Sequence, residues 1–242
     1  MRGYQVSFGG ALTPAVKLLI ILNVSVYLLT LSVQAIAPGF PITFYGGLVP
    51  DLITHKLFLW QFITYMFFHG GVMHLLINML VLWMFGGEIE RLFGTKIFYR
   101  YYFICGIGAG IFNYLVNIIF GLPGFVPIIG ASGAIYGLLA AYGIFFGDRL
   151  VFFMMLFPIR AKYFVIILGG IEFFSSLSAT QDGIAHLAHL GGMVFGLAYI
   201  YLRIIKRPPR FLKRVKDWNT RKKFKVVVSD ISEDDWNKMW RR

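Results

Sequence analysis

Long apolar stretches constrain the fold of this chain more than any other feature of its sequence. A helix needs about 20 mostly apolar residues to cross the hydrocarbon core of a bilayer. Six stretches meet or approach that length, at about 14–36, 71–87, 97–120, 132–147, 161–178 and 185–204. Hydrophobic residues make up 58% of the chain and charged residues 14%, whereas a soluble domain carries roughly a quarter charged residues. The sequence therefore predicts an all-α membrane protein, a bundle of six transmembrane helices.

The charges divide the chain into three parts. We expect a short N-terminus at 1–13, a six-helix membrane domain at 14–204 and a basic tail at 205–242. Thirteen of the 23 Lys and Arg residues lie in the tail, so the net charge of +12 is concentrated beside the membrane. That placement favours contact with anionic lipid over a nucleic-acid groove, with a docking site for a cytosolic partner as the alternative. The predicted partner is the lipid bilayer, and no nucleic acid is expected.

The connections between the stretches differ in Lys and Arg content. The connections at 88–100 and 148–162 carry three each, whereas those at 37–59, 121–131 and 179–184 share only Lys56. By the positive-inside rule both termini are cytoplasmic and the last three connections face outward. The first apolar stretch is too long for a cleavable signal peptide, so we expect it to be a span.

Four polar side chains reach a similar depth in three of these stretches. Ser132 begins the fourth stretch, His189 lies one turn into the sixth, and His74 and Asn78 lie one to two turns into the second. All three stretches run from the outer to the inner face. Polar side chains in a span usually face the bundle interior or a watery cavity. One shared site near the outer face is therefore predicted, with a serine nucleophile and a histidine base.

Small residues predict that the fourth and sixth stretches pack closely. Faces with the small-xxx-small pattern allow helix backbones to approach each other. The four residues are Gly133, Gly137, Gly192 and Gly196. Plain helix packing with an incidental serine is the alternative. His186 competes with His189 as the base, but the glycines fall three and seven residues after His189, which favours His189.

Other reactive side chains are few. Glu172 is the one acid well inside a stretch, and it is either a buried hydrogen-bonding residue or part of a water path. Cys105 is the only cysteine and lies in an apolar run, which is typical of a small core residue. The histidines lack companion Cys or carboxylate ligands at the spacing of a zinc site. We therefore expect no metal and no cofactor.

Three segments together carry a family resemblance: His69-Gly70-Gly71-Val72-Met73-His74-Leu75-Leu76-Ile77-Asn78, Gly130-Ala131-Ser132-Gly133, and Ala188-His189-Leu190-Gly191-Gly192 with Gly196. In their order, spacing and placement on the spans, the chain resembles the rhomboid intramembrane serine proteases, of the six-span type found in bacteria and archaea. The resemblance covers about residues 55–204. The segment at 86–91 also resembles the family, whereas Trp60-Gln61 departs from the Trp-Arg of many bacterial members.

The resemblance implies roles for the matching residues. Ser132 corresponds to the nucleophile and His189 to the general base, a dyad with no acidic third member. His74 and Asn78, with the Ser132 backbone N–H, correspond to the groups that stabilise the oxyanion, and Tyr136 to a tyrosine that packs on the imidazole. It also implies a substrate that is a single-span membrane protein cleaved near the outer face. The short N-terminus and the single basic tail favour a bacterial or archaeal member, which predicts a location in a prokaryotic cell membrane.

Two other functions fit parts of the pattern. A non-catalytic rhomboid-like binder that escorts membrane proteins usually lacks the serine or the histidine, and this chain has both. A small transporter or channel would carry polar residues through the full membrane depth, whereas here they cluster at the outer end.

Overall fold

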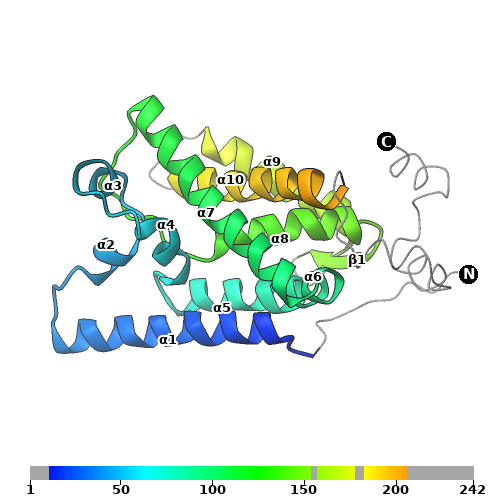
Figure 1. Ribbon diagram of the computed structural model, residues 1–242, viewed down its shortest axis with the longest axis horizontal. Helices are drawn as coiled ribbons and strands as arrows, with labels where there is room; N and C mark the ends of the chain where they lie inside the picture. Colours follow the sequence, from blue (N-terminus) through cyan, green and yellow to red (C-terminus); the bar gives the residue numbers. More distant parts are fainter. Residues whose placement is uncertain (1–10, 154–156, 178–182, 206–242) are drawn as a thin grey trace, which may run out of the picture.

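The computed structural model describes residues 11–153, 157–177 and 183–205 (Figure 1). The predicted N-terminus at 1–13 and basic tail at 205–242 fall almost entirely outside this range, so their predicted roles are not tested. Most of the described chain is helical. The main helices are α1 (Pro14–Ile36), α5 (Val72–Val81), α7 (Thr95–Phe120), α8 (Ser132–Phe145), α9 (Ala161–Ser176) and α10 (Gly183–Tyr199), which continues as the π-helix η3 (Ile200–Ile205).

The helices form one bundle with a recognisable order. In Figure 1, α1 runs alongside α5 on one side, α9 and α10 lie on the opposite side, and α7 and α8 lie between them. Within the described residues, four helical segments are long and apolar enough to cross a membrane: Pro14–Ile36, Val72–Phe93, Thr95–Phe120 and His186–Ile204. The other two predicted spans are helices of 14 and 16 residues, α8 and α9. The fold is therefore a helical membrane bundle.

The second span is longer than predicted. The sequence placed its end at about 87, but the helix continues through the π-turn η2 (Leu82–Gly86) into α6 (Gly87–Phe93). Glu88 and Glu90 lie buried on this extension. Both Glu90 carboxylate oxygens accept hydrogen bonds from the Ala15 backbone N–H at 3.0 and 3.1 Å, and Oε2 also accepts from Val16 at 3.1 Å. Glu90 therefore caps the N-terminus of α1, where unpaired N–H groups favour an anion.

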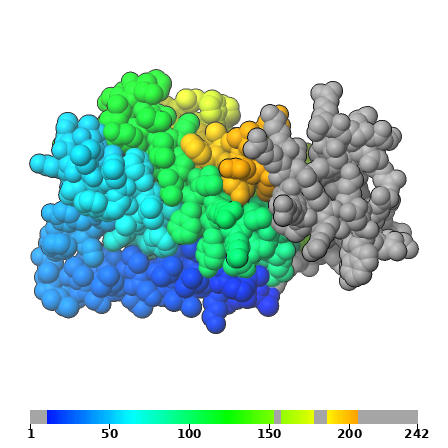
Figure 2. All heavy atoms as spheres, viewed as in Figure 1, coloured from blue at the N-terminus to red at the C-terminus, as the bar shows by residue number. Residues whose placement is uncertain are grey.

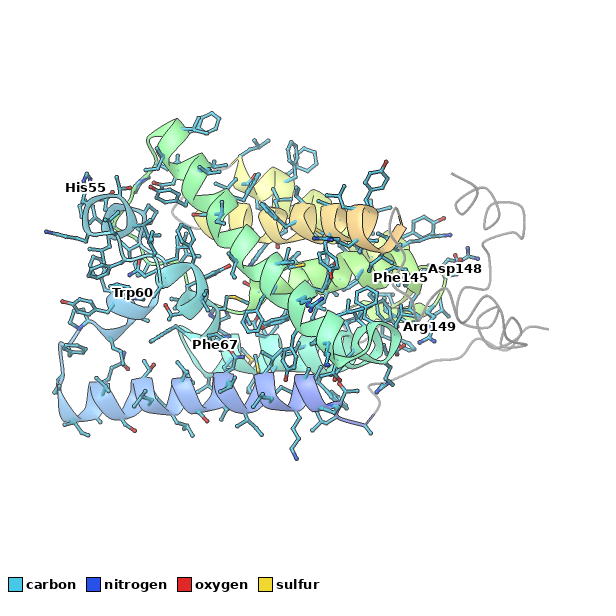
Figure 3. The ribbon with its side chains drawn as sticks, viewed as in Figure 1. His55, Trp60, Phe67, Phe145, Asp148 and Arg149 are labelled. Carbon is cyan, nitrogen blue, oxygen red and sulfur yellow. The ribbon has the colours of Figure 1, made fainter. Side chains whose placement is uncertain are left out.

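A β-hairpin joins α8 to α9, which the all-α prediction missed. Strands β1 (Leu150–Phe153) and β2 (Phe157–Arg160) pair antiparallel, with Val151 opposite Ile159. Glu88 and Arg149 form an ion pair at its base, and Lys162 Nζ donates to Asp148 Oδ1 at 2.6 Å. Figure 3 shows Asp148 and Arg149 at one end of the bundle and His55 and Trp60 at the other. The charged connection and the long first loop thus lie at opposite ends.

The long first loop is itself folded into short helices. It contains α2 (Ile42–Gly46), α3 (Pro50–Lys56), α4 (Gln61–Thr64) and the 3₁₀ turn η1 (Tyr65–Phe67). Its atoms form one end of the molecule in the space-filling view (Figure 2). Several large apolar side chains of this loop are exposed, among them Leu57 and Leu59. Such exposure suits a loop that contacts the membrane interface.

Gln61, which departs from the Trp-Arg pattern noted above, anchors this loop. Its side chain is fully buried. Oε1 accepts a hydrogen bond from the Val49 backbone N–H at 2.9 Å, and Nε2 donates to the carbonyls of Phe44 at 3.0 Å and Tyr45 at 3.2 Å. Trp60 Nε1 also donates to the Tyr45 carbonyl, at 3.2 Å. A neutral amide thus ties three backbone positions of the loop together.

Candidate active site

The predicted glycines bring α8 and α10 into backbone contact. A Cβ added at Gly192 would lie 1.8 Å from the Gly133 carbonyl oxygen, and one at Gly196 would lie 3.1 Å from Gly137 Cα. At Gly192 no side chain fits without moving backbone, and at Gly196 an added Cβ would also lie 2.6 Å from the Tyr101 hydroxyl. This glycine seam, formed by Gly133, Gly137, Gly192 and Gly196, fixes the residues at the start of each helix relative to each other.

The seam brings Ser132 and His189 together. Ser132 is the first residue of α8, and its Oγ lies 2.7 Å from His189 Nε2. That distance is a normal hydrogen bond between a hydroxyl and an imidazole nitrogen. His186, the competing histidine, lies one turn earlier on α10 and faces Glu172 instead. Of the two histidines, His189 is the one whose hydrogen bond reaches the serine.

Tyr136 packs flat against the His189 imidazole. The two ring centroids are 4.3 Å apart and the planes differ by 10°. Tyr136 lies one turn beyond Ser132 on α8, so one helix supplies both the hydroxyl and the platform for the ring. The Tyr136 hydroxyl also donates a hydrogen bond to Glu172 Oε1. Rotation of the imidazole away from the serine is therefore restricted.

An acidic residue stands on the other side of His189, which sequence reasoning did not assign to the site. Glu172 is 5% exposed. Its Oε2 lies 3.0 Å from His189 Nδ1, although this contact is outside hydrogen-bond geometry, and 2.5 Å from His186 Nδ1. The available signal was the position of a lone acid inside an apolar stretch, since such residues usually face a functional interior.

The same three residues offer a set of metal-ligating atoms. One ligand atom from each of Glu172, His186 and His189 lies within 4.8 Å of the others, and no other such group occurs among the described residues. The sequence has no companion carboxylate at the spacing of a zinc site; in the structure the carboxylate comes from another helix, α9. The contacts of Glu172 with Tyr136 and with the two histidines account for this grouping.

His74 and Asn78 lie on one face of α5, as their spacing predicts. The Asn78 side-chain nitrogen donates to the His74 carbonyl at 2.8 Å, and His74 Nδ1 accepts from the Gly70 N–H at 3.4 Å. An added Cβ at Gly130 would lie 2.9 Å from His74 Nε2 and 3.6 Å from Ser132 Oγ. His74 and Ser132 therefore border the same small space, which the absence of a side chain at Gly130 keeps open.

Gly130 is also required by its backbone. Its φ is +124°, a conformation that residues with a side chain rarely adopt. Its N–H donates to the Tyr65 carbonyl at 2.9 Å, and Leu48 pairs with Ile128 two residues earlier. The first loop thus supports the segment that leads into Ser132.

His69 is a buried neighbour of this site. Its side chain is 3% exposed, and its ring meets that of His74 edge to face at a centroid distance of 5.0 Å. Burial, with a smaller contribution from the charge of His74, lowers the pKa of His69 to about 4. His69 is therefore neutral at physiological pH. This packing indicates a structural role for His69.

These features define a class: a multi-pass helical membrane protein with a serine and a histidine hydrogen-bonded at a glycine-packed helix contact. Comparison with known families identifies it further. The family model described as Rhomboid domain matches residues 56–206, more than half of the chain, and the chain belongs to the rhomboid family.

Individual relatives support the same assignment. Rhomboid protein 1, mitochondrial, of Saccharomyces cerevisiae is 28% identical over 72% of this chain and 50% of its own length. Putative rhomboid protease YdcA of Bacillus subtilis is 30% identical over 63% of this chain and 71% of its own length. Rhomboid protease GlpG of Haemophilus influenzae is 31% identical over 59% and 69%. The chain thus spans half the length of the yeast relative and 38% of RHOMBOID-like protein 1 of Arabidopsis thaliana.

Proposed function

We propose that this protein is an intramembrane serine endopeptidase in which Ser132 is the nucleophile and His189 the general base. The observation that carries the proposal is the 2.7 Å hydrogen bond between Ser132 Oγ and His189 Nε2. Membership of the rhomboid family supports it, as do relatives named rhomboid proteases. A serine needs an adjacent base because its hydroxyl is a weak nucleophile at neutral pH.

The reaction follows acyl-transfer chemistry. His189 Nε2 takes the proton of Ser132 as Oγ attacks the carbonyl carbon of the substrate peptide bond. The imidazolium then gives that proton to the departing amine, which leaves an acyl-enzyme. His189 next removes a proton from water, whose oxygen attacks the ester carbonyl. The bond between that carbon and Ser132 Oγ then breaks, His189 returns its proton to Oγ, and the acid product is released. Tyr136 keeps the imidazole facing the serine throughout both halves of the reaction.

Stabilisation of the oxyanion is assigned to three donors. The Ser132 backbone N–H lies in the first turn of α8, where helix N–H groups have no intrahelical partner and point toward developing negative charge. His74 Nε2 borders the space beside Ser132 Oγ. Asn78 uses one amide hydrogen on the His74 carbonyl, and its second is the proposed donor to the oxyanion.

The proposed substrate is a single-span membrane protein with a helix-weakening segment near its outer end. A peptide carbonyl inside a helix is already hydrogen-bonded, so an extended segment must present the bond to be cleaved. The orientation that suits this substrate has both termini of the enzyme in the cytoplasm and Ser132 near the outer face. We assign the protein to a prokaryotic cell membrane, although its relatives include proteins named as mitochondrial.

The test uses purified protein in liposomes with a reporter single-span protein that carries a helix-weakening segment. Wild type, Ser132→Ala and His189→Ala are compared, and intact folding is checked by thermal unfolding. Loss of cleavage in both variants is expected. A fluorophosphonate probe, which reacts with activated serines, should label wild type at Ser132 and neither variant. Cleavage that survives Ser132→Ala would overturn the assignment.

A further inference from the structure

A buried carboxylate lies next to the base of the proposed reaction and has no role in a serine–histidine dyad. Ala161 and Glu172 are the only buried residues of α9, and the neighbours of Glu172, Ile171 and Phe173, are about half exposed. Burying a charge within a membrane is costly unless partners compensate for it. The partners of Glu172 should therefore explain why an acid is present on this helix.

All the recorded partners of Glu172 belong to the site. Its Oε1 accepts the Tyr136 hydroxyl, and its Oε2 faces both His186 Nδ1 and His189 Nδ1. Ser132 lies on the Nε2 side of the same His189 ring. Serine, imidazole and carboxylate therefore follow one another in the order found in hydrolases with a serine–histidine–acid triad. The glutamate comes from α9, the serine from α8 and the histidine from α10.

Resting on the proposed function, we propose that Glu172 is a positioning residue that acts through His189. Its carboxylate keeps the N–H of the neutral imidazole on Nδ1, so that Nε2 carries the lone pair that takes the Ser132 proton. After transfer, both ring nitrogens carry protons, and the negative charge at 3.0 Å stabilises the imidazolium. No proton passes to Glu172, and the bonds made and broken at the substrate are unchanged.

Two neighbours hold the carboxylate itself. Tyr136 donates to one oxygen while it stacks on His189, and His186 occupies the second oxygen together with His189. His186 therefore competes with His189 for Oε2. This competition agrees with the His189 Nδ1 contact, which is short but does not have hydrogen-bond geometry. The ionisable groups that face His189 in the described residues are thus Glu172 from α9, His186 from α10, Tyr136 from α8 and His74 from α5.

The decisive variant is Glu172→Gln, which keeps the shape and a hydrogen-bond acceptor for Tyr136 but removes the charge. We measure kcat and KM for the reporter single-span protein in liposomes from about pH 5 to pH 9, the range in which histidine titrates. The expected result is a fall of about 10- to 100-fold in kcat with little change in KM, because Glu172 acts on the base and not on the bound chain. The acidic limb of the kcat/KM profile should also move to lower pH, since the imidazolium has lost its counter-charge.

Two further variants separate charge from packing. Glu172→Asp keeps the charge. Compared with Glu172→Gln, it should recover part of the cleavage rate, and the acidic limb of its kcat/KM profile should lie close to the wild-type pH. Gly170→Ala, on the same helix, adds a methyl group that meets nothing within 4 Å and should behave as wild type. A fall in rate with an unmoved acidic limb would mean that Glu172 only packs the bundle, and would overturn the proposal.

His186→Ala tests the same proposal if Glu172→Gln fails to fold. In His186→Ala, Glu172 Oε2 contacts His189 alone and stabilises its imidazolium form more strongly. The acidic limb of the kcat/KM profile should therefore move to higher pH, opposite to the shift in Glu172→Gln. An unmoved limb contradicts the proposal. Ser132→Ala, measured in parallel, distinguishes the two levels. Cleavage by Ser132→Ala would contradict the proposed function itself. If Ser132→Ala is inactive but Glu172→Gln has the wild-type rate and pH profile, only the role of Glu172 is contradicted.

Discussion

The contact between α8 and α10 and the contact between α9 and the bundle differ in how closely the helices approach. Across the glycine seam the backbones touch, and a Cβ at Gly192 would lie 1.8 Å from a carbonyl oxygen. On α9, a Cβ at Gly169 would meet only the Met193 side chain, at 3.4 Å or more, and one at Gly170 would meet nothing within 4 Å. The two proposed reacting side chains thus sit on the tightly packed pair, whereas the carboxylate sits on a helix that leaves room beside Gly169 and Gly170.

The largest effect expected from this difference is that of a single methyl group placed on each side. Gly192→Ala forces the Gly133 carbonyl away and should destabilise the protein by about 3 kcal/mol or more, since overpacking without a flexible neighbour cannot relax locally. Gly170→Ala should be neutral or slightly stabilising, because alanine favours a helix over glycine. Thermal unfolding in one detergent compares the pair, and equal melting temperatures would contradict the contrast.

The second effect concerns the site and not the packing. Gly130→Ala should reduce cleavage more than about 100-fold, because its methyl group fills the space that His74 and Ser132 share and the backbone disfavours it. Stability should fall far less than in Gly192→Ala. Steady-state cleavage of the reporter protein and thermal unfolding, measured on the same preparation, separate the two. Gly71→Ala, where a Cβ would meet nothing within 4 Å, is the control.

A smaller effect is expected from acid, through the buried His69 that packs against His74. Its pKa of about 4 in the folded protein lies below the ordinary value of about 6.5. Between about pH 6.5 and pH 4 the unfolded chain therefore binds a proton at His69 more readily than the folded protein does. The free energy of unfolding falls as the pH drops through that interval. His69→Gln should show a shallower loss of melting temperature between these pH values, whereas His55→Gln, at an exposed site, should follow wild type.

The smallest effect is expected on α9. Phe173 and Phe174 are exposed and contact each other edge to face at 5.5 Å, and we propose that substrate enters from the side, past α9 and the following loop at 179–184. The Phe173→Ala, Phe174→Ala double variant should change the cleavage rate several-fold with little change in melting temperature, since few contacts are lost. An unchanged rate would count against entry beside α9. Residues 178–182 of that loop lie outside the described range.

Hydropathy predicted the apolar segments, and small-residue spacing predicted the approach of Ser132 to His189. Both patterns can be recognised within the sequence of each helix taken by itself. They did not predict Glu172 as a neighbour of His189, since that contact depends on how α9 is rotated against α10. The extension of the second span to Phe93 was missed because Glu88 and Glu90 look like a helix end. Their partners, Arg149 and the N-terminus of α1, are distant in sequence. The hairpin after α8 was missed for a related reason, since each of its strands has only four residues.

The shortness of α8 determines how deep in the membrane this chemistry would occur. Its 14 residues give a length of about 21 Å, whereas the hydrocarbon layer is about 30 Å thick. Its far end lies beside the charged Asp148–Arg149 connection. In the proposed orientation, with that connection at the cytoplasmic boundary, Ser132 at the near end would lie roughly 9 Å below the outer boundary of that layer. Water needed for hydrolysis must therefore descend past the headgroups, and the length of one helix sets the distance of that descent.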